Sequence, residues 1–138
     1  MTFPQISTFP KASVGPYERQ MGRYILAVLD IFADRVPDSE SHSHVRQLVA
    51  DEEHWSAGHA VFNEVRRRYL TAAHHKDDLR VAQYAFEESC CQAVYNSIEP
   101  VDPFDACSSF FVVPQAMGLA ALLKVSSENI ANVFTGAG

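Results

Sequence analysis

Apolar residues recur at helical spacing along most of the chain. Between residues 17 and 36 an apolar stripe alternates with a charged side that carries Arg19 and Asp30. Apolar positions three and four residues apart predict an amphipathic helix, and Pro37 is expected to end it. Residues 1–16, which hold three prolines among scattered apolar residues, are expected to form an extended arm.

The pattern predicts a long second helix. Asp38, Ser39 or Ser41 suits its N-cap, and the helical spacing then continues to about Thr71. Roughly thirty helical residues would span about 45 Å. Because that is long for a domain of this size, we expect a kink between residues 56 and 58.

A third helix is predicted after Asp77 and Asp78, which suit a cap and a first turn. It is apolar most of the way round, as expected for a central helix that packs on several neighbours. Arg80, Gln83 and Glu87 would form its solvated edge.

The C-terminal part contains further helix signals. Residues 102–103 are an Asp-Pro pair that suits a helix start, and Pro114 forces a kink or a new helix. A last helix is expected from Ser126 or Ser127 through Phe134, followed by a flexible tail at residues 135–138.

These elements predict an all-α chain. Residues 17–134 would form a single-domain bundle of four to five helices, with a long second helix and the last long helix kinked or broken at Pro114. No strand-like alternation of convincing length and no internal repeat occurs.

Composition adds limits on partners and compartment. The chain has 138 residues, 47% of them hydrophobic, and a formal net charge of −6. Its most apolar stretch, residues 110–123, is shorter than the roughly twenty residues of a membrane span. Three cysteines, an odd number with Cys90 and Cys91 adjacent, fit a reducing interior. We therefore expect a cytoplasmic protein with no membrane partner.

Charge argues against nucleic acid as a partner. From residue 81 to residue 138 the only Lys or Arg is Lys124, while six acidic residues occur there. Duplex binding needs several cations to displace condensed counterions, so this part of the chain is not expected to bind DNA.

Three polar residues interrupt apolar stripes. Glu52 and His59 lie on the seam of the predicted second helix, and Glu88 lies on a stripe of the third. Buried carboxylates need partners, so these side chains should be hydrogen-bonded internally or exposed at a stripe edge. The alternative is a divalent metal ion held between facing helices. Apart from that alternative, no cofactor is expected.

Arg66, Arg67 and Arg68 form the most basic run of the chain. An i,i+4 pair from Glu64 to Arg68 and the dipole at a helix end would account for them structurally. As a functional site they would dock an acidic partner or a phosphate. All six histidines fall within residues 42–75, but a continuous helix would place the first pair about 45 Å from the last pair.

The sequence lacks the residue patterns of standard catalytic classes. A nucleophilic thiol needs a base or electropositive surroundings, yet Cys90 lies on an apolar stripe and Cys107 lies at the acidic start of the predicted helix after residue 102. No Ser-His-Asp order, glycine-rich phosphate loop or paired CxxC motif occurs. An enzyme of a standard class is therefore not expected.

A short segment resembles the helix-turn-helix of phage-repressor-type regulators. The matching positions are Leu119 and Ala120 on the first helix, Val125 and Ser126 at the turn, and Ile130 and Val133 on the second helix. The resemblance implies a DNA-binding regulator. It covers about fifteen residues, Lys124 stands where the family usually has glycine, and the second helix lacks Lys and Arg.

Taken together, these features favour a non-catalytic helical module that binds a protein partner, either a second copy of the chain or another protein. Arg66, Arg67 and Arg68 are its candidate binding residues. A small acidic immunity or inhibitor protein would have this character. The alternatives are a metal-binding bundle that uses Glu52, His59 and Glu88, and a helix-turn-helix-like regulator.

Overall fold

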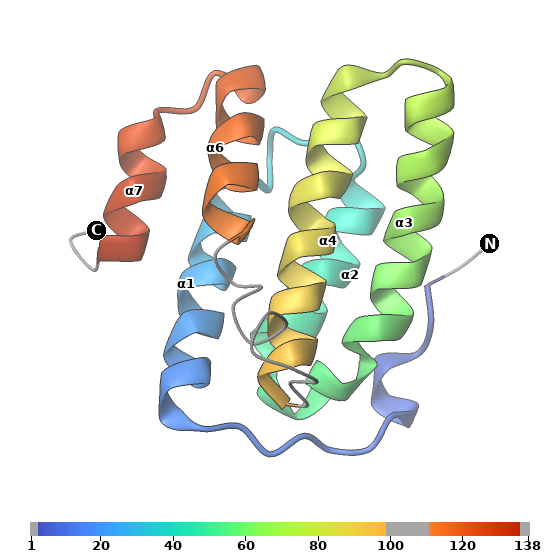
Figure 1. Ribbon diagram of the computed structural model, residues 1–138, viewed down its shortest axis with the longest axis vertical. Coiled ribbons are helices and arrows are strands. Elements are labelled where there is room, and N and C mark those ends of the chain that lie inside the picture. Colours follow the sequence, from blue (N-terminus) through green and yellow to red (C-terminus); the bar gives the residue numbers. More distant parts are fainter. Residues whose placement is uncertain (1–2, 99–110, 136–138) are drawn as a thin grey trace.

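The computed structural model describes residues 3–98 and 111–135, and both ranges are helical without any strand (Figure 1). Six α-helices and two short 3₁₀ helices occur there: η1 (Ile6–Thr8), α1 (Pro16–Phe32), α2 (Ser39–Ala50), η2 (Glu52–Ala57), α3 (Gly58–His74), α4 (Asp78–Ile98), α6 (Val112–Leu123) and α7 (Ser127–Thr135). The predicted all-α bundle is confirmed, with six helices in place of four to five.

Helix α1 begins at Pro16, a residue that suits the first turn because its missing N–H needs no partner there. Its apolar stripe is buried, with Ile25, Val28 and Leu29 at its centre. The helix ends at Phe32, five residues before Pro37, and a turn follows at residues 33–35. The predicted helix is therefore present but shorter than its apolar pattern.

The prediction of one long second helix is wrong, because the chain breaks after Ala50 and folds back on itself. Asp51 is extended, with φ −126° and ψ 108°, and its carboxylate accepts from the backbone N of Glu53 at 3.1 Å. Helix η2 then turns the chain, and α3 returns beside α2 (Figure 1). Trp55, buried in the turn, fixes the reversal by donating from Nε1 to the carbonyl of Val49 at 3.3 Å.

The reversal also overturns the expected separation of about 45 Å between the two ends of this segment. Arg68 Nη1 lies 2.9 Å from Asp38 Oδ2, although thirty residues separate the two in sequence. Asp38 is the N-cap of α2, accepting from the backbone N of Ser41 at 3.1 Å. The end of α3 therefore lies at the beginning of α2.

Helix α4 is the central helix, as its apolar circumference predicts. It contacts α1, α2, α3, α6 and η2. The expected solvated edge is wrong for two of its three residues: Gln83 and Glu87 are 0% exposed, because α2 packs on that side of α4. Arg80 is partly exposed.

Helices α6 and α7 form the C-terminal pair and pack against each other. Pro114 is the third residue of α6, in the first turn, where the missing N–H breaks no helical hydrogen bond. A new helix thus begins near Pro114, and α7 matches the predicted last helix. The expected helix start at residues 102–103 and the residues after 135 lie outside the described ranges.

The N-terminal arm lies against the bundle and contains one 3₁₀ turn, η1. Phe3 and Ile6 are buried in the core. The backbone N of Ala12 donates to the carbonyl of Glu53 at 3.1 Å, which ties the arm to η2. Within the described residues, every helix is too short or too polar to cross a membrane.

Candidate functional site

The three consecutive arginines of α3 point in different directions, because successive residues of a helix lie about 100° apart. Arg66 pairs with Glu88 of α4. Arg67 pairs with Glu64 one turn earlier, whereas Arg68 points toward the beginning of α2. The structure therefore separates Arg66 from Arg67 and Arg68, which share Glu64 as a partner.

Arg68 joins three carboxylates. Its guanidinium lies 2.9 Å from Asp38, 2.5 Å from Glu40 and 3.1 Å from Glu64, and the side chain is 19% exposed. The ring of Phe3 from the N-terminal arm lies 4.6 Å from the guanidinium carbon. Arg68 thus connects α3 to α2 and to the arm.

The same contacts determine the protonation of Asp38 and Glu64. Burial alone would raise the pKa of Asp38, but hydrogen bonds from Tyr84, the Ser41 backbone N and Arg68 outweigh burial and lower that pKa. Burial likewise opposes ionisation of Glu64, but Arg67 and Arg68 lower its pKa overall. Both carboxyls are therefore charged at neutral pH.

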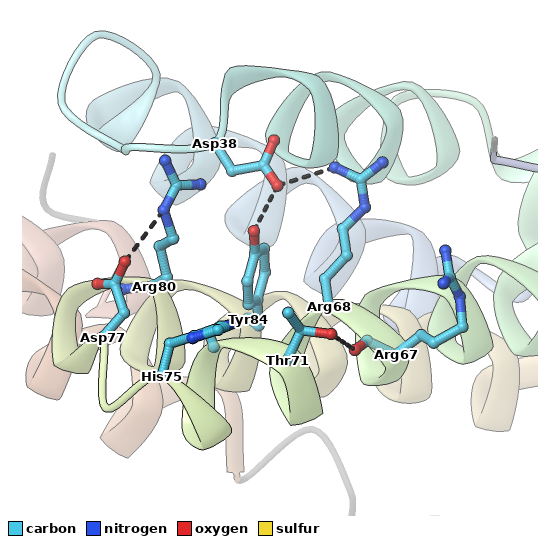
Figure 2. A pocket seen from close by; sticks show the side chains of 9 residues that line it. Asp38, Arg67, Arg68, Thr71, His75, Asp77, Arg80 and Tyr84 are labelled. Carbon is cyan, nitrogen blue, oxygen red and sulfur yellow. Dashed lines mark hydrogen bonds and ion pairs between the residues drawn. The ribbon is translucent and has the colours of Figure 1, made fainter. Parts of the chain in front are cut away.

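Beside Arg68 a polar cavity of about 360 Å³ opens between the end of α3 and the beginning of α4 (Figure 2). We call it the polar cavity. Its lining includes Arg67, Arg68, Thr71, His75, Asp77, Arg80, Tyr84 and Asp38. Two of the arginines in this lining belong to the predicted basic run, and the third, Arg80, comes from α4.

On another side of α3, rings and a guanidinium gather in what we call the aromatic–arginine face: His59, Phe62, Arg66 and Tyr69 of α3 and Tyr95 of α4. The guanidinium carbon of Arg66 lies 5.6 Å from the centre of the Phe62 ring and 5.2 Å from that of Tyr69. The His59 ring stacks on Phe62 at 6.2 Å between centroids and lies 5.7 Å from Tyr95.

A hollow of about 220 Å³ lies at one end of this face. Phe62, His59 and Tyr95 line it, together with Gly58 and Gln92. Because Gly58 has no side chain, α3 approaches α4 closely at this point, where a Cβ would lie 2.9 Å from Cβ of Tyr95.

The three residues considered for a metal site have separate partners. Glu52 binds Arg19 of α1, with Oε1 2.9 Å from Nη2. His59 belongs to the aromatic–arginine face. Oε1 of Glu88 lies 2.6 Å from Nε of Arg66 as an ion pair, although it is not aligned as a hydrogen bond. Among the described residues, no three histidine, cysteine or carboxylate side chains are grouped closely enough to hold one metal ion.

A buried polar network lies between α2 and α4, and sequence reasoning missed it. Glu87 accepts from Ser41 Oγ and from Gln83 Nε2, the latter at 2.7 Å. His42 donates from Nε2 to the carbonyl of Leu29 at 2.7 Å, and its Nδ1 lies 3.7 Å from Glu87 Oε2. The apolar residues almost all round α4 are the sequence signal from which burial of its few polar residues could have been predicted.

Burial is the main cause of the shifted pKa values in this part of α4. It raises the pKa of Glu87, and the neighbouring His42, Gln83 and Ser41 offset only part of that effect. It also raises the pKa of the Cys90 and Cys91 thiols, which opposes formation of the reactive thiolate. Cys107 lies outside the described residues.

The segment that resembles a helix-turn-helix comprises α6, a short connection and α7. Lys124 ends α6 in the left-handed conformation, with φ 59° and ψ 38°. That conformation favours glycine, the residue usual at this place in phage-repressor-type regulators. Helix α7 carries neither Lys nor Arg, so it offers no cation to a phosphate backbone.

Comparison with known proteins gives no match to any family model, curated protein or solved structure.

Proposed function

We propose that this protein is a non-catalytic binding module that recognises a protein partner through the aromatic–arginine face. The observation that carries the proposal is the gathering of four rings and one guanidinium on the α3–α4 pair, with a hollow at one end. An immunity or inhibitor protein is one example of such a binding module, and that role stays a prediction.

The residue types of this face support binding of protein. Aromatic residues and arginine are enriched at protein interfaces and supply most of the residues that dominate binding energy. Ring contacts on Phe62 and Tyr69 already hold the guanidinium of Arg66. Ordering a free side chain on binding costs roughly 0.5–1.5 kcal/mol of conformational entropy. An arginine that is already ordered by its neighbours therefore binds a partner with a smaller entropy loss.

The hollow defines what the partner must present. Its volume of about 220 Å³ corresponds to roughly seven water molecules at about 30 Å³ each, enough for one leucine- or phenylalanine-sized side chain. The guanidinium carbon of Arg66 lies 5.6 Å from the centre of the Phe62 ring, which lines the hollow. The partner would therefore place an apolar side chain in the hollow and a polar or acidic group beside it, near Arg66.

Two face variants and one control variant test this proposal. Arg66→Ala and Tyr95→Ala should each weaken partner binding at least roughly tenfold, whereas Tyr17→Ala, which removes an exposed ring from α1, should leave it unchanged. Light scattering after size exclusion measures self-association, and affinity capture with quantitative mass spectrometry measures binding of another chain.

Equal binding by the wild type and by both face variants would contradict the proposal. A monomer that captures no protein from its native lysate would contradict it as well. Circular dichroism of each variant separates loss of binding from loss of fold.

A further inference from the structure

The polar cavity lies on a different side of α3 from the aromatic–arginine face. Relative to Arg66, the α3 positions that line the cavity are rotated by about 100–180°. Its volume of about 360 Å³ corresponds to roughly a dozen water molecules, the size of a small organic molecule. Cavities of at least about 300 Å³ are typical of small-molecule sites.

One wall of the cavity is held rigidly. Asp38 Oδ2 accepts from the Tyr84 hydroxyl at 2.5 Å and from Arg68 Nη1 at 2.9 Å (Figure 2). Burial and the neighbouring Asp38 raise the pKa of Tyr84 to about 12, so the hydroxyl remains a donor at neutral pH. Because Asp38 already has these donors, its charge is largely satisfied within the wall.

Two other guanidiniums of the lining remain accessible. The side chains of Arg67 and Arg80 are 46% and 40% exposed. Arg80 pairs with Asp77 at 3.2 Å in an exposed contact, a kind of pair that contributes little to stability. Arg67 pairs with Glu64, which also has Arg68 at 3.1 Å. Both arginines can therefore turn to a ligand without leaving a buried carboxylate unpaired.

We propose that the polar cavity binds a small organic anion through a phosphate or carboxylate group held between Arg67 and Arg80, with His75 and Thr71 beside it. Each of the two exposed guanidiniums pairs with one carboxylate, and the oxyanion of the ligand would take the place of that partner. The planar fork of arginine matches the oxygen geometry of both phosphate and carboxylate. This site is independent of the proposed protein partner.

The test is a nuclear magnetic resonance titration of the full chain with inorganic phosphate and, separately, with citrate. Ionic strength is held constant with sodium chloride. We expect saturable shifts of backbone amides confined to the residues around the cavity. Arg67→Gln and Arg80→Gln should each raise the dissociation constant at least tenfold.

Arg46→Gln is the matched control. Arg46 is 45% exposed and pairs with Asp30 at 2.6 Å on another part of the surface, so its loss should leave the titration unchanged. Arg67→Lys keeps the charge but not the fork, and its affinity should lie between those of the wild type and Arg67→Gln. Thermal unfolding of each variant shows whether the fold is retained.

Each outcome has a defined meaning. Saturation by phosphate alone assigns the site to a phosphate-bearing molecule, and saturation by citrate alone assigns it to a carboxylate. Saturation by both supports the shared oxyanion chemistry. Shifts that do not saturate, that sodium chloride reproduces, or that survive in both glutamine variants would overturn the proposal.

Discussion

At the scale of a residue, Arg68 and Arg46 show how burial changes the contribution of an ion pair to stability. Arg68 contacts carboxylates from two helices and is 19% exposed, whereas Arg46 makes one exposed pair with Asp30. Removing one partner from a poorly solvated cluster leaves the remaining charges uncompensated. Solvent and salt replace an exposed pair at little loss.

Arg68→Ala should therefore lower the free energy of unfolding by about 2–4 kcal/mol. Arg46→Ala should lower it by less than about 1 kcal/mol. Urea unfolding followed by circular dichroism measures both. Similar losses in the two variants would mean that the Arg68 cluster is screened by solvent like an ordinary surface pair.

The protonation of Glu87 is tied to folding because its carboxyl is fully buried. Burial raises its pKa above the ordinary value of 4.5. Between that value and the raised one, the native carboxyl holds a proton that the unfolded chain has released. The contribution of Glu87 to the free energy of unfolding is therefore complete at low pH and decreases as pH rises from its ordinary pKa through its raised one.

Glu87→Gln, which mimics the protonated acid, should remove this dependence. As pH rises from 4.5 through the raised pKa of Glu87, the wild type should lose up to about 1.4 kcal/mol per pH unit relative to the variant. Asp38 and Glu64, whose lowered pKa values act in the opposite direction, are present in both proteins and cancel in the comparison. A constant difference between the two proteins from pH 5 to pH 8 would contradict the expectation.

At the scale of elements, periodicity predicted α1, α4 and α7 well because their signal is local. The kink expected at residues 56–58 falls where η2 meets α3, but the pattern missed the reversal between α2 and α3 because the same spacing continues on both sides of η2. What decides the break is tertiary: Trp55 is buried beside Gly22, where a Cβ would lie 2.5 Å from Cζ2 of the indole. A contact between residues so distant in sequence leaves no trace in a helical pattern.

Gly58, at the start of α3, and Gly118, within α6, provide a matched test of close packing. A Cβ on Gly58 would lie 2.9 Å from Cβ of Tyr95 and 3.0 Å from the carbonyl of Cys91, whereas one on Gly118 would meet nothing within 4 Å. Gly58→Ala should destabilise the fold by about 1–3 kcal/mol. Gly118→Ala, within α6, should stabilise it by about 0.5–1 kcal/mol.

Thermal unfolding compares the two substitutions under one condition. Opposite signs are expected, since both changes add the same methyl group and only one site is crowded. If Gly58→Ala were neutral, α3 and α4 would be able to separate locally at this point.

The connection between α6 and α7 gives another prediction at this scale. Lys124 holds a left-handed conformation that strains a residue with a side chain. Lys124→Gly should raise the free energy of unfolding by about 0.5–1 kcal/mol, measured by urea unfolding. Lys124→Ala, which keeps the Cβ, should bring no such gain.

At the scale of the whole molecule, the sequence predicted which residues were unusual but not where they would meet. Arg67 was singled out by its place in a basic run, yet Arg80 completes the same cavity from another helix. Glu52 and Glu88 interrupted apolar stripes as expected of paired carboxylates, and their partners, Arg19 and Arg66, came from other helices. Only the packing of helices determines such pairs.

The central place of α4 predicts the order of local stability. Its amides from Phe86 to Val94 should exchange with solvent only through global unfolding. Helix α7, which contacts α1 and α6 and buries Ile130 alone, should exchange at least roughly tenfold faster. Hydrogen exchange read by mass spectrometry measures both. Equal protection of the two helices would contradict this order.

The burial of Trp55 at the chain reversal has a practical consequence. It is the only tryptophan of the chain, and it is buried beside Gly22 where α2 gives way to α3. Its fluorescence therefore reports on one defined place without any label. Emission should shift to longer wavelength when water reaches the indole, and a shift that precedes the loss of helical signal would identify the reversal as the first part of the molecule to open.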